Sequence, residues 1–439
     1  MNVKLEIPDL SKTATSKSER TRLTILSAAA KQFKMRGYGP STLRKIADAA
    51  GVEAGSIYYH FASKEEIFNA VLDIGLTQLY IAVKDARAEC EAAGAGFRDT
   101  FQQMVAAHLS YLLKENDFTS SNIRNYSMLA EPMRERHRPL RLAYVDLWDT
   151  LLKKAQAKGD IRSDIKIIPL RQFLLGALNW MGEWFNASRY PVSMLSESAA
   201  TLILDGMLVD ACKQPFAMTE QEDFTEAGLI DEPETKVART RMHILSSAAR
   251  VMRAVGYSAA TLRRIAAEAE MESGSIYYHF SSKENLLDEV LDRGLREMAD
   301  GVSKILYDEA RYPDLSHQLA AAINAHMRVL FARSEFTSAN IRMYGQLPQE
   351  LRERHRPVRR KYAAAWDACL ENAQAKKVIR GDFEVVPLRL FLLGALNWTV
   401  EWFDPAKGDQ DGFYTLQEMI ALQQTLLLNG IARSDTADA

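Results

Sequence analysis

The chain has 439 residues, of which 47% are hydrophobic and 26% are charged, and its formal net charge is −2. This composition suits soluble domains with sizeable cores, and no apolar run approaches the roughly 18 residues that a membrane span needs. The first 17 residues lack the apolar core of a signal peptide. We therefore expect neither a membrane segment nor a secretion signal.

Taken in chain order, apolar residues that recur every three or four positions first predict a helix over Glu19–Arg36. Gly37 is expected to stop this helix at its C-terminus. A second helix is expected over Thr42–Ala50. Gly51 then permits a sharp turn, and Ala54–Phe61 begins a short third helix. This order predicts a helix-turn-helix.

Most of the patterns in the first half of the chain return in the second. The heptapeptide GSIYYHF begins at Gly55 and again 219 residues later at Gly274, and RERHRP begins at Arg134 and, 218 residues later, at Arg352. An almost constant offset indicates that a domain-sized unit of about 200 residues was duplicated whole. The three cysteines have no counterparts in the opposite repeat, which favours a reducing cytoplasm.

Each repeat also contains a helix that is apolar almost all round, LRQFLLGALNWMGEWF from Leu170 and LRLFLLGALNWTVEWF from Leu388. Such a helix must be buried on two sides. In the first copy, Gly176 and Trp180 lie off the main apolar stripe. That stripe consists of Leu170, Phe173, Leu174, Ala177, Leu178 and Met181.

Positive charge is concentrated around the two predicted helix-turn-helix segments. Lys12–Glu65 carries +6 and Lys236–Glu284 carries +4, so the rest of the chain carries −12. We call each helix-turn-helix domain a head and the helical remainder of its repeat a body. Basic heads joined to acidic bodies suit a protein that contacts phosphates. The acidic segment 213–235 contains two prolines and is expected to be an exposed linker, which either avoids the duplex or is only a solvated tether.

The pattern T-x-x-x-I-A-x-x-A-G-V-x-x-G-S-I-Y-Y-H-F-x-S-K-E, which starts at Thr42 and returns with changes at Thr261, resembles the DNA-binding domain of TetR/AcrR-family regulators. The helical remainder is similar to their ligand-binding and dimerisation part, especially in regulators of fatty-acid and steroid catabolism. The resemblance implies an all-α fold with two tandem units, each a helix-turn-helix domain followed by a helical domain. The expected segments are an arm over 1–17, units over 18–72 and 73–212, the linker 213–235, and units over 236–291 and 292–432.

The resemblance implies that Tyr59, His60 and Lys64 hold phosphates. Glu53, Ala54 and Tyr58 are candidates for reaching base edges. One tyrosine of each pair could instead pack in the core, where Phe61 and Phe280 are expected. The full predicted DNA-binding set is Thr42, Lys45, Glu53, Ala54, Gly55, Ser56, Tyr58, Tyr59, His60 and Lys64 with Thr261, Arg264, Glu272, Ser273, Gly274, Ser275, Tyr277, Tyr278, His279 and Lys283.

Lys45 and Arg264 depart from the family pattern, because many relatives carry an acidic residue there that completes a capping box. A cation in a first helical turn is unfavourable by roughly 0.3–1 kcal/mol. Its presence in both repeats predicts a phosphate contact, with a tolerated surface cation as the alternative.

Family members work as homodimers on pseudo-palindromic DNA, whereas here both heads belong to one chain. We therefore predict an intramolecular pseudo-dimer, in which the helices from Leu170 and Leu388 pack together with helices near Ser198–Ala211 and Tyr414–Leu428. The expected partner is a double-stranded DNA operator with an imperfect inverted repeat. The protein is expected to repress transcription when it binds there. Pairing between two chains on one operator is the alternative.

A small-molecule effector is expected, because aromatic walls with a few polar groups are typical of ligand pockets. They are equally typical of helical cores. Arg124 and Arg342 could meet a carboxylate or phosphate, and RERHRP is either a CoA-phosphate contact or a solvated helix end. The predicted ligand-binding residues are His108, Arg124, Tyr126, Trp148, Asn179, Trp180, His326, Arg342, Tyr344, Trp366, Asn397 and Trp398.

Subfamily resemblance suggests an acyl-CoA or a hydrophobic carboxylic acid as the effector, and control by a protein partner is the alternative. The sequence contains no nucleophile elbow, phosphate loop, zinc-ligand spacing or nucleotide fingerprint. We therefore expect no enzyme activity, no cofactor and no metal.

Overall fold

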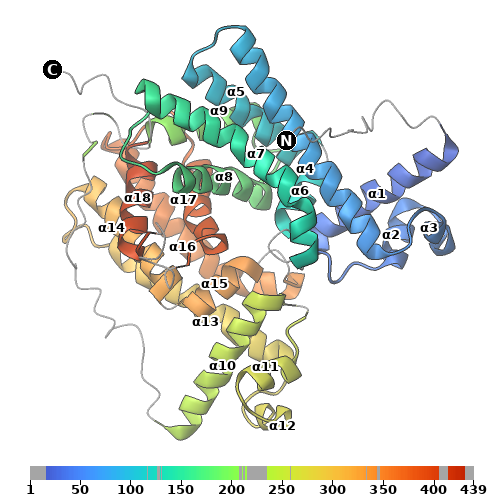
Figure 1. Ribbon diagram of the computed structural model, residues 1–439. Helices are drawn as coiled ribbons and strands as arrows, with labels where there is room; N and C mark the ends of the chain where they lie inside the picture. The colour runs from blue at the N-terminus through green and yellow to red at the C-terminus, as the bar shows by residue number, and fades with distance from the viewer. Residues whose placement is uncertain are drawn as a thin grey trace. The chain divides into compact units, whose positions relative to one another are not determined.

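The computed structural model describes residues 16–115, 117–125, 129, 131–206, 210, 213–214, 235–257, 259–332, 334–343, 347–404 and 414–430 (Figure 1). These residues contain helices and turns and no extended strand, so the predicted all-α fold is confirmed. Most of the expected N-terminal arm and of the acidic linker lies outside the described residues.

The two repeats fold into the same succession of helices. The first gives α1 (Lys17–Arg36), α2 (Leu43–Ala50), α3 (Ala54–His60), α4 (Lys64–Ala92), α5 (Phe97–Ser110), a π-helical turn (Tyr111–Glu115), α6 (Asp117–Asn125), α7 (Glu131–Lys158), α8 (Ile167–Trp184) and α9 (Val192–Asp205). The second gives α10 (Lys236–Val255), α11 (Leu262–Glu268), α12 (Ser273–Ile276), α13 (Lys283–Leu306), α14 (Leu315–Ala332), α15 (Ser334–Met343), α16 (Gln349–Ala375), α17 (Val385–Trp398), a 3-10 turn (Thr399–Glu401) and α18 (Leu416–Leu428).

The chain divides into two compact units that do not coincide with the repeats. Unit 1 comprises Met1–Leu151 and Phe185–Ser196, and unit 2 comprises Leu152–Trp184 and Glu197–Ala439. Unit 2 therefore contains α8 and most of α9 from the first repeat. The reason is that α8 packs on α17, its counterpart from the second repeat.

Helices α8 and α17 meet through a reciprocal contact between a tryptophan and a glycine. A Cβ atom built on Gly394 would lie 2.6 Å from Cδ1 of Trp180, and a Cβ atom on Gly176 would collide with the ring of Trp398. Each indole ring thus lies directly on the backbone of the opposite helix. The predicted stripe of α8 is buried as well, so the expectation that this helix is covered on two sides is confirmed.

A second contact between the repeats lies where α9 and α18 end. The backbones of Gly206 and Gly430 approach so closely that a Cβ atom on either would collide with the other segment, and both have positive φ, 71° and 75°. The predicted helix near Ser198–Ala211 therefore begins earlier and ends at Asp205, because Gly206 leaves the helical conformation. The predicted helix at Tyr414–Leu428 begins at Leu416, where Thr415 caps it.

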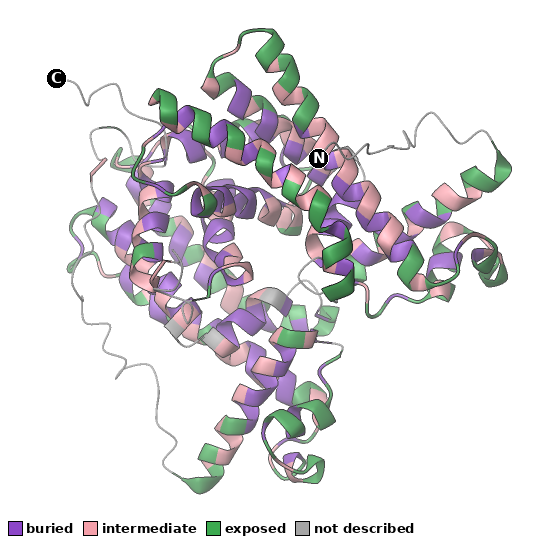
Figure 2. Cartoon of the chain, viewed as in Figure 1, coloured by how far each residue is buried: buried purple, intermediate pink, exposed green. Residues whose placement is uncertain are grey.

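In each repeat the core of the helix-turn-helix continues into the helical body (Figure 2). Phe33, Ile57 and Phe68 share a cluster with Phe118 from α6, and the second repeat has Phe336 from α15 in the corresponding cluster. Among the described helices, α4 is long and apolar enough by composition to cross a membrane. It packs on α1, α5 and α6, as the core helix of a folded domain does.

Candidate DNA-binding surface and effector core

The first helix-turn-helix is built by α1, α2 and α3. Thr42 caps α2, because its hydroxyl oxygen accepts a hydrogen bond from the backbone N–H of Lys45 at 3.3 Å. Gly51 ends α2 in the left-handed conformation with φ of 66°. The turn predicted at Gly51 is therefore confirmed, and it leads into α3 at Ala54.

Helix α3 buries one face and exposes the other. Ile57 and Phe61 are buried, whereas Tyr58 and Tyr59 are 64% and 84% exposed. Residues four apart share a helix face, which explains why 57 and 61 both turn inward. The core position predicted for Phe61 is confirmed. Core packing of one tyrosine, the alternative interpretation of the pair, is wrong.

The second helix-turn-helix presents the same side chains from a shorter helix. Helix α12 ends at Ile276, and Tyr277–His279 continue as a turn in which the His279 N–H donates to the Ile276 carbonyl at 2.9 Å. Tyr277 and Tyr278 are nonetheless 61% and 90% exposed, and Phe280 is buried as predicted.

The other predicted DNA-binding residues of the two heads are accessible to solvent. Their side chains are exposed or half-buried: Thr42, Glu53, Ala54, Ser56 and His60 in the first head, and Thr261, Glu272, Ser273, Ser275 and His279 in the second.

Gly55 and Gly274 are exposed, and neither is required by packing inside the protein. A Cβ atom built on either would have no atom within 4 Å among the described residues, and neither has a positive φ. Alanine would therefore fit and would favour the helix. Packing within the described residues therefore does not account for glycine at either position.

Lys45 and Arg264 are held in equivalent ways at the edge of this surface. The Lys45 ammonium donates to the carbonyl of Pro40, and the Arg264 guanidinium to that of Ala259, both at 3.1 Å. Both side chains are exposed. Each cation thus lies beside the helix start, where it can meet a phosphate without a change in the helix.

Lys64 closes the loop between α1 and α2. Its ammonium donates to the carbonyls of Tyr38 and Ser41, each at 3.0 Å, and lies 4.0 Å from the centre of the Tyr38 ring. Burial lowers the pKa of Lys64, and burial likewise lowers that of Lys283. An ammonium group has three N–H donors, so a phosphate contact by Lys64 would share a group that already holds the loop.

Sequence reasoning missed Arg22 and Arg241, which occupy equivalent positions in the two repeats. Each guanidinium lies over a buried phenylalanine ring. Its carbon is 4.3 Å from the centre of the Phe61 ring in the first repeat and 4.1 Å from that of Phe280 in the second. Arg241 also donates to the His279 carbonyl and pairs with Glu289. The signal was the tripeptide RTR, which occurs in both copies.

The motif FTS-x-NIR connects each head to its helical body. In the first repeat, the Thr119 hydroxyl donates to the carbonyl of Gly75 at 3.1 Å, where α6 crosses α4. The side-chain oxygen of Asn125 accepts from the Tyr38 N–H at 3.0 Å, and Arg124 donates to the Lys34 carbonyl of α1. The structure thus places Arg124 against the head.

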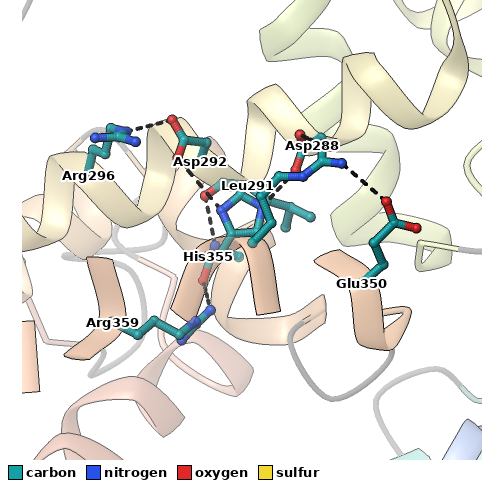
Figure 3. Close-up of polar contacts among 9 residues, drawn as sticks. Asp288, Leu291, Asp292, Arg296, Glu350, His355 and Arg359 are labelled. Carbon is teal, nitrogen blue, oxygen red and sulfur yellow. Dashed lines mark hydrogen bonds and ion pairs between the residues drawn. The ribbon is translucent and has the colours of Figure 1, made fainter. Parts of the chain in front are cut away.

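RERHRP forms a clamp between the body and the helix that leaves the head. In the second repeat, Nε2 of His355 lies 2.8 Å from one oxygen of Asp288 (Figure 3). Arg354 binds the other oxygen at 2.5 Å. In the first repeat, His137 and Arg136 both lie 2.9 Å from Asp73 of α4. Both histidines are buried, so these segments are more than solvated helix ends.

Charge pairing in the clamp affects Asp73. Burial alone would raise the pKa of its carboxyl group, but hydrogen bonds and charge from His137 and Arg136 outweigh burial and hold that pKa below its usual range.

The body of each repeat contains a buried histidine paired with a tyrosine. Nδ1 of His108 lies 2.6 Å from the Tyr144 hydroxyl, and Nδ1 of His326 lies 2.9 Å from the Tyr362 hydroxyl. His326 also contacts the side-chain oxygen of Asn397 at 3.1 Å. Burial lowers the pKa of His326 to about 4, and the Asn397 hydrogen bond offsets part of that effect.

The four predicted tryptophans fall into two groups. Trp148 and Trp366 are fully buried in α7 and α16, and Trp148 meets Phe101 edge to face. Trp180 and Trp398 lie in the contact between α8 and α17, as does the half-buried segment that carries Asn179. The predicted residues Tyr126 and Tyr344 lie outside the described residues, as does the side chain of Arg342.

Two protein-family models match the chain, and each matches twice. The model described as bacterial regulatory proteins, tetR family, matches 25–71 and 244–290. The model described as tetracyclin repressor-like, C-terminal domain, matches 94–207 and 313–431. Each repeat therefore carries one copy of both domains.

Individual relatives align with about half of the chain. The HTH-type transcriptional repressor KstR2 of Rhodococcus jostii (strain RHA1) is 27% identical over 199 residues, which cover 44% of this chain and 94% of KstR2. The fatty acid metabolism regulator protein of Bacillus subtilis (strain 168) is 23% identical over 190 residues, 42% of this chain and 94% of that protein. The crystal structure of the TetR family transcriptional regulator PfmR from Thermus thermophilus is 25% identical and covers 43% of this chain and 99% of PfmR, with a TM-score of 0.38.

Proposed function

Because the chain belongs to the TetR family of bacterial DNA-binding transcription regulators, we propose that it is a cytoplasmic repressor that holds one operator with both heads of a single polypeptide. A hydrophobic acyl ligand releases it. The observation that carries the DNA-binding part is the pair of exposed segments, 53–60 and 272–279, each with a glycine that the protein's own packing does not require.

The proposed contact with DNA follows from the faces of these segments. The exposed hydroxyl groups of Tyr58 and Tyr59 and the half-buried imidazole of His60 offer hydrogen-bond donors to phosphates and base edges. The Gly55 backbone lies among them without a side chain, so DNA can approach the helix closely. The net charge of +6 around the first head and +4 around the second attracts the duplex.

The single-chain arrangement is supported by the contact between α8 and α17. Each helix supplies one glycine and one tryptophan to that contact, so the two repeats use the same surface against each other. A surface that pairs with its own copy is the mark of a two-fold interface. Here the copy is supplied by the same chain, and we infer that one chain occupies one operator.

The effector is proposed to bind in the helical bodies, and the class proposed is an acyl-CoA or a hydrophobic carboxylic acid. His326, Tyr362 and Asn397 form a polar group within a largely apolar helical core. Such a group can orient one polar end of a mostly apolar ligand. The name of the Bacillus subtilis relative, a fatty acid metabolism regulator, points to the same ligand class.

DNA binding is tested with the double variant Gly55→Ala/Gly274→Ala and fluorescence anisotropy on a labelled duplex from upstream of the gene. We expect an unchanged or slightly higher unfolding free energy, because alanine favours a helix, together with at least about tenfold weaker DNA binding. Gly96→Ala/Gly381→Ala is the matched control, since those glycines also have open space around them and lie in the bodies. Equal DNA affinity of both double variants would contradict the proposed contact.

The effector class is tested on the preformed complex with long-chain acyl-CoA, the free fatty acid and CoA alone. Acyl-CoA or the acid should release the duplex, and CoA alone should not. Tyr362→Phe and Tyr144→Phe each delete the hydroxyl that faces the histidine of one repeat. If only one variant changes the ligand concentration needed to release the duplex, the body that carries it binds the ligand. Retention of the duplex at every ligand concentration would exclude this class.

A further inference from the structure

The two recognition segments are identical except at one residue. Segment 53–60 reads EAGSIYYH and segment 272–279 reads ESGSIYYH, so Ala54 in the first head stands where Ser273 stands in the second. Both residues are exposed, and both begin the helix that carries the tyrosines. A difference between the heads in direct base reading is therefore concentrated at this position.

Most neighbouring differences between the heads belong to packing or charge, and the exposed pair Ala62 and Ser281 lies after the segments that carry the tyrosines. Val52 and Met271 both pack against the core of their own head. Glu268, which replaces Ala49, is bound by Arg250 at 2.6 Å. Lys45 and Arg264 are both cations with the same backbone anchor, so they suit phosphates alike.

Alanine and serine have different preferences in the major groove. An alanine methyl group contacts the methyl group of thymine, whereas a serine hydroxyl donates or accepts a hydrogen bond and is compatible with several bases. Because the remaining exposed residues of the segments are the same, the rest of each half-site should be read alike.

We propose that Ala54 and Ser273 determine the orientation of the protein on its operator. The half-site under the first head requires thymine at the base pair that residue 54 reads, and the half-site under the second head does not. The operator is thus an inverted repeat with one asymmetric position. This inference rests on the proposed single-chain binding to one operator.

The orientation is tested by selecting duplexes from a random library with four proteins and sequencing them. The wild-type protein should enrich an inverted repeat with thymine at that position in one half only. Ser273→Ala should enrich thymine in both halves, and Ala54→Ser in neither. The exchange variant Ala54→Ser/Ser273→Ala should restore the asymmetry with the operator reversed relative to the chain, as tethered cleavage from Asp48→Cys in the first head would reveal.

The thymine methyl group is tested directly by replacing that thymine with deoxyuridine in the selected operator. The wild-type protein should bind about fourfold more weakly, the loss typical of one buried methyl group. Ala54→Ser should be insensitive to the replacement. The substituted side chains are exposed, so all variants should keep the wild-type melting temperature.

The outcomes separate the inference from the function on which it rests. A library without any enriched sequence would overturn sequence-specific binding and, with it, the orientation. An enriched operator that is symmetric at every position but binds one chain per duplex in native mass spectrometry, or an asymmetry that the exchange variant leaves unchanged, would overturn the orientation alone. A symmetric operator that binds two chains would overturn the single-chain binding itself.

Discussion

The two heads present nearly the same surface to DNA on different supports. The first turns from α2 to α3 on Gly51, and the second makes the corresponding turn on Glu270, which has a positive φ of 52°. In the second head, Arg241 pairs with Glu289, whereas Ala70 holds the equivalent place in the first. Apart from Ala54 and Ser273, the residues of segments 53–60 and 272–279 are thus the same in both heads, while the framework beneath them differs.

The largest effect is expected at a feature that both halves share. Gly294 and Gly75 lie where α15 and α6 cross the long helix, and a Cβ atom on either would collide with the backbone carbonyl of Phe336 or Phe118. Because a backbone cannot move aside as a side chain can, Gly294→Ala or Gly75→Ala should each cost about 3 kcal/mol.

Segment-resolved hydrogen exchange would measure this loss in each half. Gly55→Ala, where the added carbon meets open space, is the control. If only one of the two variants lost stability in its own half, the two helix crossings would not be equivalent.

Acid should destabilise the body of the second repeat through His326. Its pKa is lowered to about 4 in the folded protein, against about 6.5 in the unfolded chain. The unfolded chain therefore binds a proton first, and stability present above pH 6.5 falls by about 3 kcal/mol as the pH approaches 4.

Denaturant unfolding at several pH values would show this fall in the free energy of unfolding as a slope against pH. His326→Gln should reduce the slope. His317→Gln changes an exposed histidine of the same helix and should leave most of it. A slope that persists in His326→Gln would assign the acid sensitivity to another group.

Arg241→Met should destabilise its head more than Arg22→Met destabilises the first. Arg241 holds a backbone carbonyl and Glu289 as well as the Phe280 ring, so its loss should cost about 2 kcal/mol. The contact of Arg22 with the Phe61 ring corresponds to about 1 kcal/mol or less.

Segment-resolved hydrogen exchange would compare the stability of the head in the two variants. Ala70→Glu supplies Arg22 with the partner that Arg241 has, and it should narrow the difference between the heads. Equal losses in both single variants would show that the Glu289 pair adds nothing.

The smallest effect is expected at the turns. Glu270→Gly should stabilise the second head by about 1 kcal/mol, because glycine adopts a left-handed conformation without the penalty of a side chain. Gly51→Ala should destabilise the first head by a similar amount. Opposite signs in chemical denaturation would support the comparison, and stabilisation by both would refute it.

Local sequence signals predicted the heads well. Thr42 and Gly51 set the limits of α2 within one residue. Helix α1 begins at Lys17, before the predicted start at Glu19, because Ser16 and Glu19 form a capping box. The early end of α12 was not predicted, because residues 273–279 repeat those of α3 except for Ser273 in place of Ala54.

Contacts between distant segments were harder to predict. The pairing of Trp180 with Gly394 and of His355 with Asp288 depends on where whole helices cross. Periodicity along one helix shows which face is apolar, but it does not identify the residue opposite. For this reason RERHRP was predicted as either a ligand contact or a solvated end, and its role as a clamp came only from the structure.

Native mass spectrometry of the protein with a duplex from upstream of its gene would show whether one chain supplies both heads to one operator. We expect a complex with a single 49.4 kDa chain per duplex. Two chains on each duplex, with one head of each engaged, would contradict it.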